Sequence, residues 1–319
     1  MATILITGGT GMIGQALTRR LLEKGHSINI LSRKSGTRKP AGEGERIHYY
    51  RWNPDEQFID PEAISTADHI VHLAGANIAG KRWTPSRKRL IRNSRVLAGE
   101  LICRALKEIP NKVDTIVSAS AIGWYGPDPV IPNTRPFRES DPVENDFLGF
   151  TCRDWEASIR PAAAQGKRLV IFRIGIVLSS SGGALPEFKK PLRFGLGAIL
   201  GKGNQRISWI HIDDLVRLFG AALSDTQFNG VYNAVTEQCV TNRELILTLA
   251  KLQRGRFFLP LHIPSFVLKL VLGEMSIEVL KSCTVSPAKL SGAGFVFRFP
   301  EIKQALTDLT GPASGRSEK

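Results

Sequence analysis

Short apolar runs that alternate with longer segments of helical period most limit how this chain can fold. Between the first two runs, Ile13, Leu17 and Leu21 recur every four residues, and Gly25 follows where a left-handed helix C-cap would sit. The runs lie at residues 3–6, 27–31, 47–50, 69–73, 115–118 and 169–173. Strand, helix and strand in this order form βαβ units, which stack into a parallel sheet. The pattern therefore predicts an α/β fold of the Rossmann doubly wound type.

Three glycines stand between the first predicted strand and the first predicted helix. Gly8 can make the tight turn, Gly11 lets backbone N–H groups approach a pyrophosphate, and Gly14 lets the helix pack closely on the strand. The helix N-terminus adds partial positive charge. A plain glycine-rich turn is the alternative, but the register of strand, glycines and helix favours a dinucleotide site.

The end of the second predicted strand indicates which dinucleotide is preferred. An NAD site usually carries an acid there for the ribose 2′-hydroxyl, whereas this chain has Ser32, Arg33 and Lys34, with no carboxylate before Glu43. A hydroxyl and two cations suit a 2′-phosphate, which Arg33 can contact with two hydrogen bonds. NADP is therefore favoured over NAD. The alternative is that the two cations belong to an ordinary solvated loop.

The alternation of strand and helix stops after about residue 235, which predicts a second lobe. We expect an NADP-binding Rossmann domain over residues 1–235, with the segment of about 178–206 contributing to the substrate lobe. Residues 236–310 would form that small, mainly helical C-terminal lobe, and residues 311–319 a disordered tail. Helices are expected at 243–252, 267–272 and 277–280, a break at 260–264, and a surface loop at 127–146, which holds five prolines and five acids.

Composition limits the partners and the compartment. The chain has 43 Lys and Arg against 29 Asp and Glu, a net charge of +14 at pH 7, so anions would be attracted at long range. Four scattered cysteines without a CxxC pair argue against structural zinc and favour a reducing compartment, and no metal site is predicted. The first apolar run is too short for a signal peptide, and no run approaches the ~18 residues of a membrane span. We expect a cytoplasmic protein without a membrane partner.

Five motifs follow one another in a specific order. They are TGGTGMIG at 7–14, HLAGAN at 72–77, SASAIGWYG at 118–126, DWE at 154–156 and WIHIDDL at 209–215. Together with a tail pattern over 260–300, they resemble the extended, atypical short-chain dehydrogenase/reductase superfamily, in its NAD-dependent epimerase/dehydratase-like subgroup. Some members of this subgroup are described as nucleotide-sugar-epimerase-related or as cell-division inhibitors. The resemblance covers nearly the whole chain.

The resemblance also implies which residues touch the cofactor. Its phosphates would lie on Gly8, Thr10, Gly11, Met12 and Ile13. Leu73, Ala74 and Gly75 would pass beside its ribose, Arg95 would reach it from the following helix, and Val177 would line the nicotinamide side. These positions agree with the rule that ligands of open α/β sheets lie outside the carboxyl ends of the strands. Ordinary strand-end packing is the alternative for Leu73, Ala74 and Val177.

The catalytic pair of this superfamily is missing. A Ser or Thr there holds the substrate oxygen, while a Tyr-x-x-x-Lys pair transfers its proton. Ser120 matches the serine, but Leu148 and Cys152 stand at the tyrosine and lysine positions, and no other Tyr-x-x-x-Lys occurs. Leucine has no proton to give, and a neutral thiol has no fixed charge. Tyr125 is the best substitute donor, with a role in the pocket wall as its alternative.

Several other residues could take part in catalysis, but each also has a purely structural explanation. Glu156 could act as a base, although an exposed helix face explains it as well, and Cys152 as a nucleophile would need a lowered pKa. His211 and the two aspartates after it are interpreted as a strand and the start of a helix, not as a dyad or a metal site. His72 is interpreted as a packed strand residue.

Residues 81–95 hold seven cations and no acid. Pro85 suits the first turn of a helix. Because the stretch follows the strand end at 73–75, we expect Lys81, Arg82 and Trp83 to overhang the cofactor cleft and meet an anionic substrate. A solvated helix is the alternative.

Three functions follow from these patterns. We expect an NADP(H)-dependent oxidoreductase or epimerase-like enzyme that acts on a small, anionic or nucleotide-linked substrate. A catalytically silent NADPH-binding sensor or scaffold is the alternative, because the catalytic pair is missing. Nucleic-acid binding has only the charge in its favour, with no recognised motif, so no nucleic-acid partner is expected. The patterns predict no particular oligomeric state.

Overall fold

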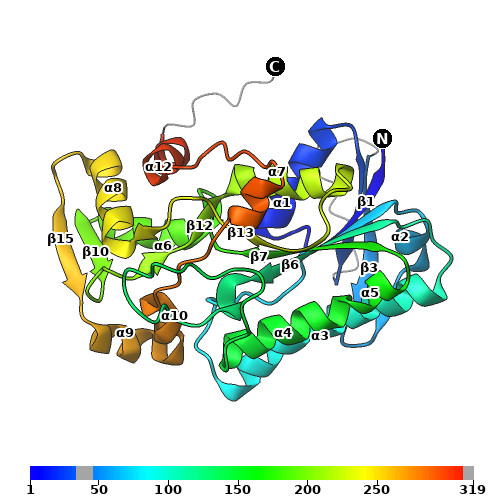
Figure 1. Cartoon of the computed structure of the whole chain (residues 1–319), viewed down its shortest axis with the longest axis horizontal. Coiled ribbons are helices and arrows are strands. Elements are labelled where there is room, and N and C mark those ends of the chain that lie inside the picture. The colour runs from blue at the N-terminus through cyan, green and yellow to red at the C-terminus, as the bar shows by residue number, and fades with distance from the viewer. Residues whose placement is uncertain (34–45, 312–319) are drawn as a thin grey trace.

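A mostly parallel sheet runs through the centre of the molecule (Figure 1), in a computed structural model that describes residues 1–33 and 46–311. Its eight described strands have the order β13-β7-β6-β5-β1-β2-β3-β4, and all neighbours are parallel except β3 and β4. The strands are β1 Thr3–Thr7, β2 Ser27–Ser32, β3 Ile47–Asn53, β4 Phe58–Ile59, β5 His69–His72, β6 Thr115–Ala121, β7 Arg168–Ile174 and β13 Gly230–Ala234. The α/β fold and all six predicted strands are confirmed.

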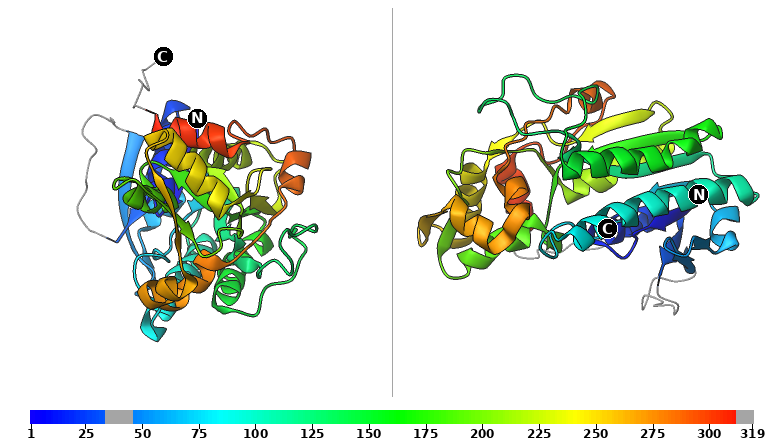
Figure 2. Two further views of the ribbon diagram at one scale, coloured as in Figure 1. Left: turned by 90° about the vertical axis from the view of Figure 1, so that its left-hand side faces the viewer. Right: turned by 90° about the horizontal axis from the view of Figure 1, so that it is seen from below.

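Helices cover both faces of this sheet. On one face α1 (Met12–Glu23) packs against α7 (Ile212–Ser224), and on the other α3 (Pro85–Glu108) lies along α4 (Phe147–Ile159), as Figure 2 shows from below. Shorter helices α2 (Pro61–Ser65) and α5 (Pro161–Ala164) complete that second face. Helix α1 buries Leu17 and Leu21 as its period predicts, and Gly25 follows it with φ +84. These layers bring the carboxyl ends of β1, β2 and β5 to one edge.

A smaller group of elements lies at one end of the long axis (Figure 1, left). Strands β10 (Leu196–Leu200) and β15 (Leu259–Ile263) form a parallel pair beside α6 (Ala184–Leu192) and α8 (Asn242–Arg254). Helices α9 (Ser265–Leu272), η3 (Gly273–Met275) and α10 (Ser276–Leu280) follow. The three predicted helices of this region are confirmed. The expected break at 260–264 is wrong, because β15 runs through most of it; this strand tolerates Pro260 since one of its edges pairs with no other strand among the described residues.

Short elements join the two parts. Strands β8 (Ile176–Ser179), β9 (Gly182–Gly183) and β12 (Trp209–His211) form a small sheet, and β11 (Arg206–Ile207) pairs with β14 (Val240–Thr241). The remaining elements are η2 (Ile122–Trp124), α11 (Ala288–Gly292) and α12 (Ile302–Thr310). Residues 127–146 contain no helix or strand, as predicted, and Asp128 in this loop accepts hydrogen bonds from Ser282 and Thr284. The division into two lobes stays a prediction, and 312–319 of the expected tail lie outside the described residues.

None of the described helices is long and apolar enough to cross a membrane.

Candidate functional site

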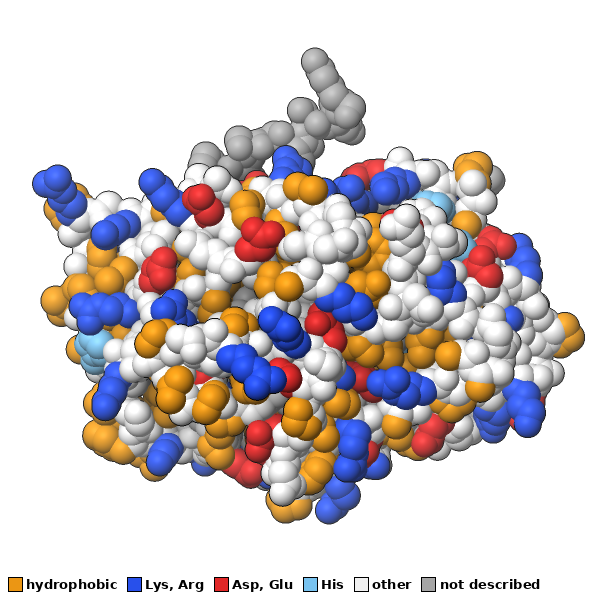
Figure 3. Space-filling view, in the orientation of Figure 1, with side chains coloured by type: hydrophobic (Ala, Val, Ile, Leu, Met, Phe, Trp, Pro, Cys, Tyr) orange, Lys and Arg blue, Asp and Glu red, His pale blue; other side chains and the backbone are white. Residues whose placement is uncertain are grey.

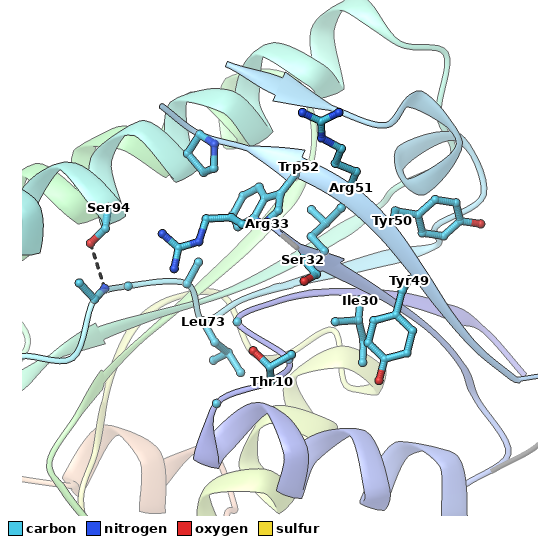
Figure 4. Close-up of a pocket in the computed structure, with 18 of the residues that line it drawn as sticks. Thr10, Ile30, Ser32, Arg33, Tyr49, Tyr50, Arg51, Trp52, Leu73 and Ser94 are labelled. Atoms are coloured by element: carbon cyan, nitrogen blue, oxygen red, sulfur yellow. Dashed lines mark hydrogen bonds between the residues drawn. The ribbon is translucent and has the colours of Figure 1, made fainter. Parts of the chain in front are cut away.

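A cleft of about 1500 Å³ opens at the carboxyl ends of β1, β2, β3 and β5 (Figure 4). Its walls come from four segments, residues 8–11, 30–33, 49–52 and 73–77, with part of the α3 surface opposite. An open cleft at this edge of a doubly wound sheet is where such folds bind their ligands. The structure therefore places the candidate site where the glycine pattern predicts it.

The glycine loop is shaped by backbone contacts that leave no room for side chains. Gly8 has φ +70, and a Cβ on it would lie 2.9 Å from the carbonyl carbon of Leu73, while a Cβ on Gly14 would overlap the Gly8 carbonyl oxygen. Gly11 is the N-cap of α1 and supplies no side-chain cap, and the first turn carries no acid. The N–H groups at the start of α1 thus face a space that a pyrophosphate fits.

Thr7, which the sequence patterns did not single out, holds the backbone segment that lies opposite this loop. Its hydroxyl accepts hydrogen bonds from the backbone N–H groups of Leu73 and Ala74, each at 3.1 Å. The same hydroxyl lies 2.8 Å from Nδ1 of His72 and, with both lone pairs used, donates its proton there. Burial lowers the pKa of His72 to about 3, so the ring is neutral and packed, as predicted. Its position directly before the first glycine is the sequence signal by which Thr7 could have been recognised.

The end of β2 presents a hydroxyl and a cation to the cleft. Ser32 and Arg33 both line it, and Figure 4 shows the Arg33 side chain extending toward the space between Leu73 and Ser94. Arg33 is exposed and has no carboxylate partner within the part of the chain that the structure describes. Arg51 on β3 stands beside Ser32 in the sheet register and lines the same cleft. Lys34 lies outside the described residues.

Arg95 lies beneath the 73–77 loop and outside the cleft wall. Its guanidinium group donates to the carbonyl of Ala76 at 3.1 Å and stacks 5.0 Å above the ring of Trp155, and a Cβ on Gly75 would lie 2.8 Å from its Cζ. Burial lowers its pKa to about 10. Arg95 supports the loop in this arrangement, and its predicted contact with the cofactor stays a prediction.

The predicted cofactor residues divide into two groups. Eight of them line the cleft: Gly8, Thr10, Gly11, Ser32, Arg33, Leu73, Ala74 and Gly75. Met12, Ile13, Gly14, Arg95 and Val177 do not. Val177 lies on β8. Met12, the first residue of α1, packs under β9: its sulfur would lie 3.3 Å from a Cβ on Gly182 and 3.4 Å from one on Gly183. The cofactor roles of these residues stay predictions.

Ser120 and Tyr125 belong to a buried polar network. The Ser120 hydroxyl donates to Glu156 Oε1 at 2.9 Å, and the Arg173 guanidinium group donates to both Glu156 oxygens, at 2.8 and 3.1 Å. The Tyr125 hydroxyl donates to Asn233 Oδ1 at 2.7 Å and accepts from Arg173 at 3.1 Å. Burial raises the pKa of Tyr125 to about 12. The catalytic roles predicted for Ser120 and Tyr125 stay predictions, since both hydroxyls are engaged inside the protein.

Two alternatives from the sequence analysis need correction. Glu156 is not on an exposed helix face, because it is only 1% exposed and pairs with Arg173 and Arg160. Cys152, also buried, does not have the lowered pKa that a nucleophile needs, because burial and the Glu156 charge raise it to about 12. All four cysteines are free, and no group of residues that could hold a metal occurs among the described residues.

The interpretation of His211 is confirmed. It ends β12 and caps α7, with its ring accepting from the Asp213 N–H at 3.1 Å. Asp214 is fully buried, where it accepts from the backbone N–H groups of Arg298 and Phe299. Both residues hold chain segments together.

The basic stretch 81–95 joins α3 to the C-terminal helices. Helix α3 begins at Pro85, as predicted, with Thr84 as its side-chain cap. The Arg82 guanidinium group donates to the carbonyls of Leu270 and Val271 at the end of α9, and Lys88 forms an ion pair with Glu274. Residues 81–83 do not line the cleft, whereas Arg87, Leu90 and Ser94 do. The predicted contact of Lys81, Arg82 and Trp83 with an anionic substrate stays a prediction.

Comparisons with known proteins agree with this geometry. The model of the NAD dependent epimerase/dehydratase family matches residues 4–234, and a domain of unknown function matches residues 263–309. An epimerase family protein of Staphylococcus saprophyticus is 37% identical over 312 residues, which are 97% of this chain and 99% of the relative. One of Mycobacterium bovis is 35% identical over 96% of each chain.

Two solved structures share both sequence and fold. A human epimerase family protein, crystallised with NADPH, has 31% identity and a TM-score of 0.82 over 96% of this chain and 98% of its own. A nucleoside-diphosphate sugar epimerase of Corynebacterium glutamicum has 32% identity and a TM-score of 0.75 over 97% of this chain and 58% of its own. The cleft, the glycine loop and these matches lead to one conclusion: the chain belongs to the NAD dependent epimerase/dehydratase family.

Proposed function

We propose that the protein binds NADP(H) in the cleft, with the pyrophosphate on the glycine loop and the 2′-phosphate at the end of β2. The observation that carries this proposal is the pair Ser32 and Arg33, which line the cleft where an NAD site would place an acid. The human relative crystallised with NADPH supports the same choice. A guanidinium group can hold a phosphate with two charge-assisted hydrogen bonds.

A titration with NADPH and NADH tests this choice. Replacing Arg33 and Lys34 by Asp and Ala should weaken NADPH binding at least about tenfold, because charge-assisted hydrogen bonds to the 2′-phosphate are lost. NADH binding should hold or improve, since an aspartate can accept from a 2′-hydroxyl. Arg153→Asp, an exposed arginine on α4, is the matched control and should change neither affinity. Unchanged NADPH binding in the double variant would contradict the assignment.

We further propose that the bound cofactor serves an oxidoreductase or epimerase-like reaction on a small, anionic or nucleotide-linked substrate. The nicotinamide ring supplies reversible hydride transfer when bound. Family membership supports this reaction class, and so does Ser120, which matches the serine of the superfamily motif that the sequence resembles. The chain's own contribution is to hold the cofactor through the glycine loop and the 73–77 loop, which Thr7 and Arg95 keep in place.

A silent NADPH-binding sensor is the second candidate, and one observation favours it. Leu148 and Cys152 replace the usual Tyr and Lys, and the hydroxyls of Ser120 and Tyr125 are bonded within the protein. NADPH oxidation measured over a panel of carbonyl and nucleotide-sugar substrates separates the two candidates. Turnover lost in Ser120→Ala at unchanged NADPH affinity supports the enzyme. Tight NADPH binding without turnover on any substrate supports the sensor.

A further inference from the structure

One end of the molecule carries most of its net positive charge. Residues 188–212 and 245–273 hold nine Lys and Arg and no Asp or Glu, while the other 34 Lys and Arg of the chain face 29 acids. The first segment contributes the end of α6 and β10 and continues into β11 and β12, and the second contributes most of α8, β15 and α9. Of the nine cations, only Lys190 has a carboxylate partner, Glu187, within the described part of the chain. Neither the cofactor cleft nor the contact of α3 with α9 uses these charges.

The same end exposes large apolar side chains. Phe194 and Phe257 are 83% and 88% exposed, and each directly follows an arginine, Arg193 and Arg256. Leu259 and Leu261 point to one side of β15 and are exposed. Phe266, Leu270 and Val271 on α9 are exposed as well. Figure 3 shows orange apolar side chains among blue cations over this end of the molecule. Water-exposed apolar groups at this density mark an interaction surface.

The two phenylalanine loops are held side by side. Arg254 donates from Nε to the carbonyl of Leu192 at 2.8 Å and also reaches the carbonyl of Arg193. The Leu259 N–H donates to the carbonyl of Gly195 at 2.8 Å. These bonds hold the loop after α6, which carries Phe194, beside the loop after α8, which carries Phe257; the strands that follow them, β10 and β15, lie at the left end of the long axis (Figure 1).

Charge and strand geometry exclude a second copy of the chain as the occupant. In a dimer formed through this surface, the nine cations of one copy would face those of the other and repel them. Edge-to-edge pairing through β15 would also lack one hydrogen bond. Leu259 and Ile263 bond toward β10, so the intervening Pro260 faces the free edge, where it has no N–H to donate. A partner that fits this surface is therefore anionic, flat and able to accommodate aromatic side chains.

We propose that this end of the molecule docks on an anionic lipid surface through its exposed residues, which are Arg193, Phe194, Arg256, Phe257, Leu259, Leu261 and the exposed apolar side chains of α9. The cations meet the lipid phosphates, and Phe194 and Phe257 enter the boundary between headgroups and acyl chains. This contact is peripheral and needs no spanning helix. It departs from the expectation of no membrane partner, which rested on the lack of a spanning segment.

Co-sedimentation of the full chain with lipid vesicles tests the proposal. The protein should bind vesicles of phosphatidylcholine mixed with phosphatidylglycerol, bind pure phosphatidylcholine weakly, and dissociate at high salt. Phe194→Ser combined with Phe257→Ser should weaken binding at least about tenfold. Arg193→Glu combined with Arg256→Glu should do the same. Phe58→Ser, on β4 in the other part of the molecule, is the matched control and should bind as the parent does.

Three results would overturn the proposal. The first is no binding to anionic vesicles, or equal binding by the Phe194→Ser/Phe257→Ser variant with an unchanged unfolding midpoint. The second is a dimer in light scattering that the same variant dissociates, which would make the surface an interface between copies. The third is binding to a DNA or RNA duplex that is stronger than binding to the vesicles and is lost in the charge-reversal variant.

Discussion

Glu156→Gln separates a structural from a catalytic use of the buried network. Glu156 and Arg173 are 1% and 2% exposed, and the substitution keeps the shape but leaves the Arg173 charge without its carboxylate. Removing one partner of a buried ion pair costs about 3 to 5 kcal/mol of unfolding free energy, and we expect the lower end because the amide oxygen can still accept one hydrogen bond. For a chain of 319 residues this lowers the unfolding midpoint by about 5 °C.

The assay is urea and thermal unfolding of purified variants. Glu187→Gln, which breaks the exposed pair with Lys190, is the control and should cost less than about 1 kcal/mol. Combining Glu156→Gln with Arg173→Met removes both charges and should cost less than the sum of the single changes. A Glu156→Gln protein as stable as the parent but without turnover would refute the structural interpretation and return Glu156 to the catalytic candidates.

Three further predictions concern the cofactor loop and its buried neighbours. Gly14→Ala should weaken NADPH binding at least about tenfold, because its Cβ would overlap the Gly8 carbonyl, whereas Gly220→Ala on α7, whose Cβ meets no atom closer than 3.9 Å, should bind normally in the same titration. Cys152 should resist alkylation at pH 8 until the protein unfolds, since its pKa lies near 12; fast labelling of this thiol, located by mass spectrometry in the native protein, would contradict that. Because His72 has a pKa of about 3 when folded and 6.5 when unfolded, stability should be full above pH 6.5 and fall as the pH drops, by about 2 kcal/mol at pH 5. His72→Gln should flatten this dependence in urea unfolding at pH 7.5 and pH 5, and an unchanged slope would refute it.

The sequence predicted those parts of the site that depend on neighbours along the chain. Gly8, Gly11 and Gly14 lie within one strand, turn and helix, so their spacing alone indicates the phosphate loop. Ser32 and Arg33 end a strand whose apolar pattern is clear, and both line the cleft. The six predicted strands were recognisable for the same reason, because each is a short run built around apolar residues; five of these runs are largely buried, and the run at 47–50 is only partly so.

Features that depend on distant partners were not predictable in this way. Tyr125 bonds to Asn233 across 108 positions, and the buried Glu156 on α4 pairs with Arg173 on β7. Arg82 seemed free to reach a substrate until α9, about 190 residues later, supplied two carbonyls. The strand at β15 was missed because Pro260 argues against a strand unless an edge is known to be unpaired.

The packing of β9 against the Met12 side chain has a mechanical consequence. Met12 is the first residue of α1, at the helix end beside the glycine loop, and its side chain also packs against Gly182 and Gly183. A shift of that helix end would therefore press, through the Met12 side chain, on the segment that leads into α6. Enzyme and sensor alike could use this contact, because a nucleotide bound as proposed would lie against the same helix end.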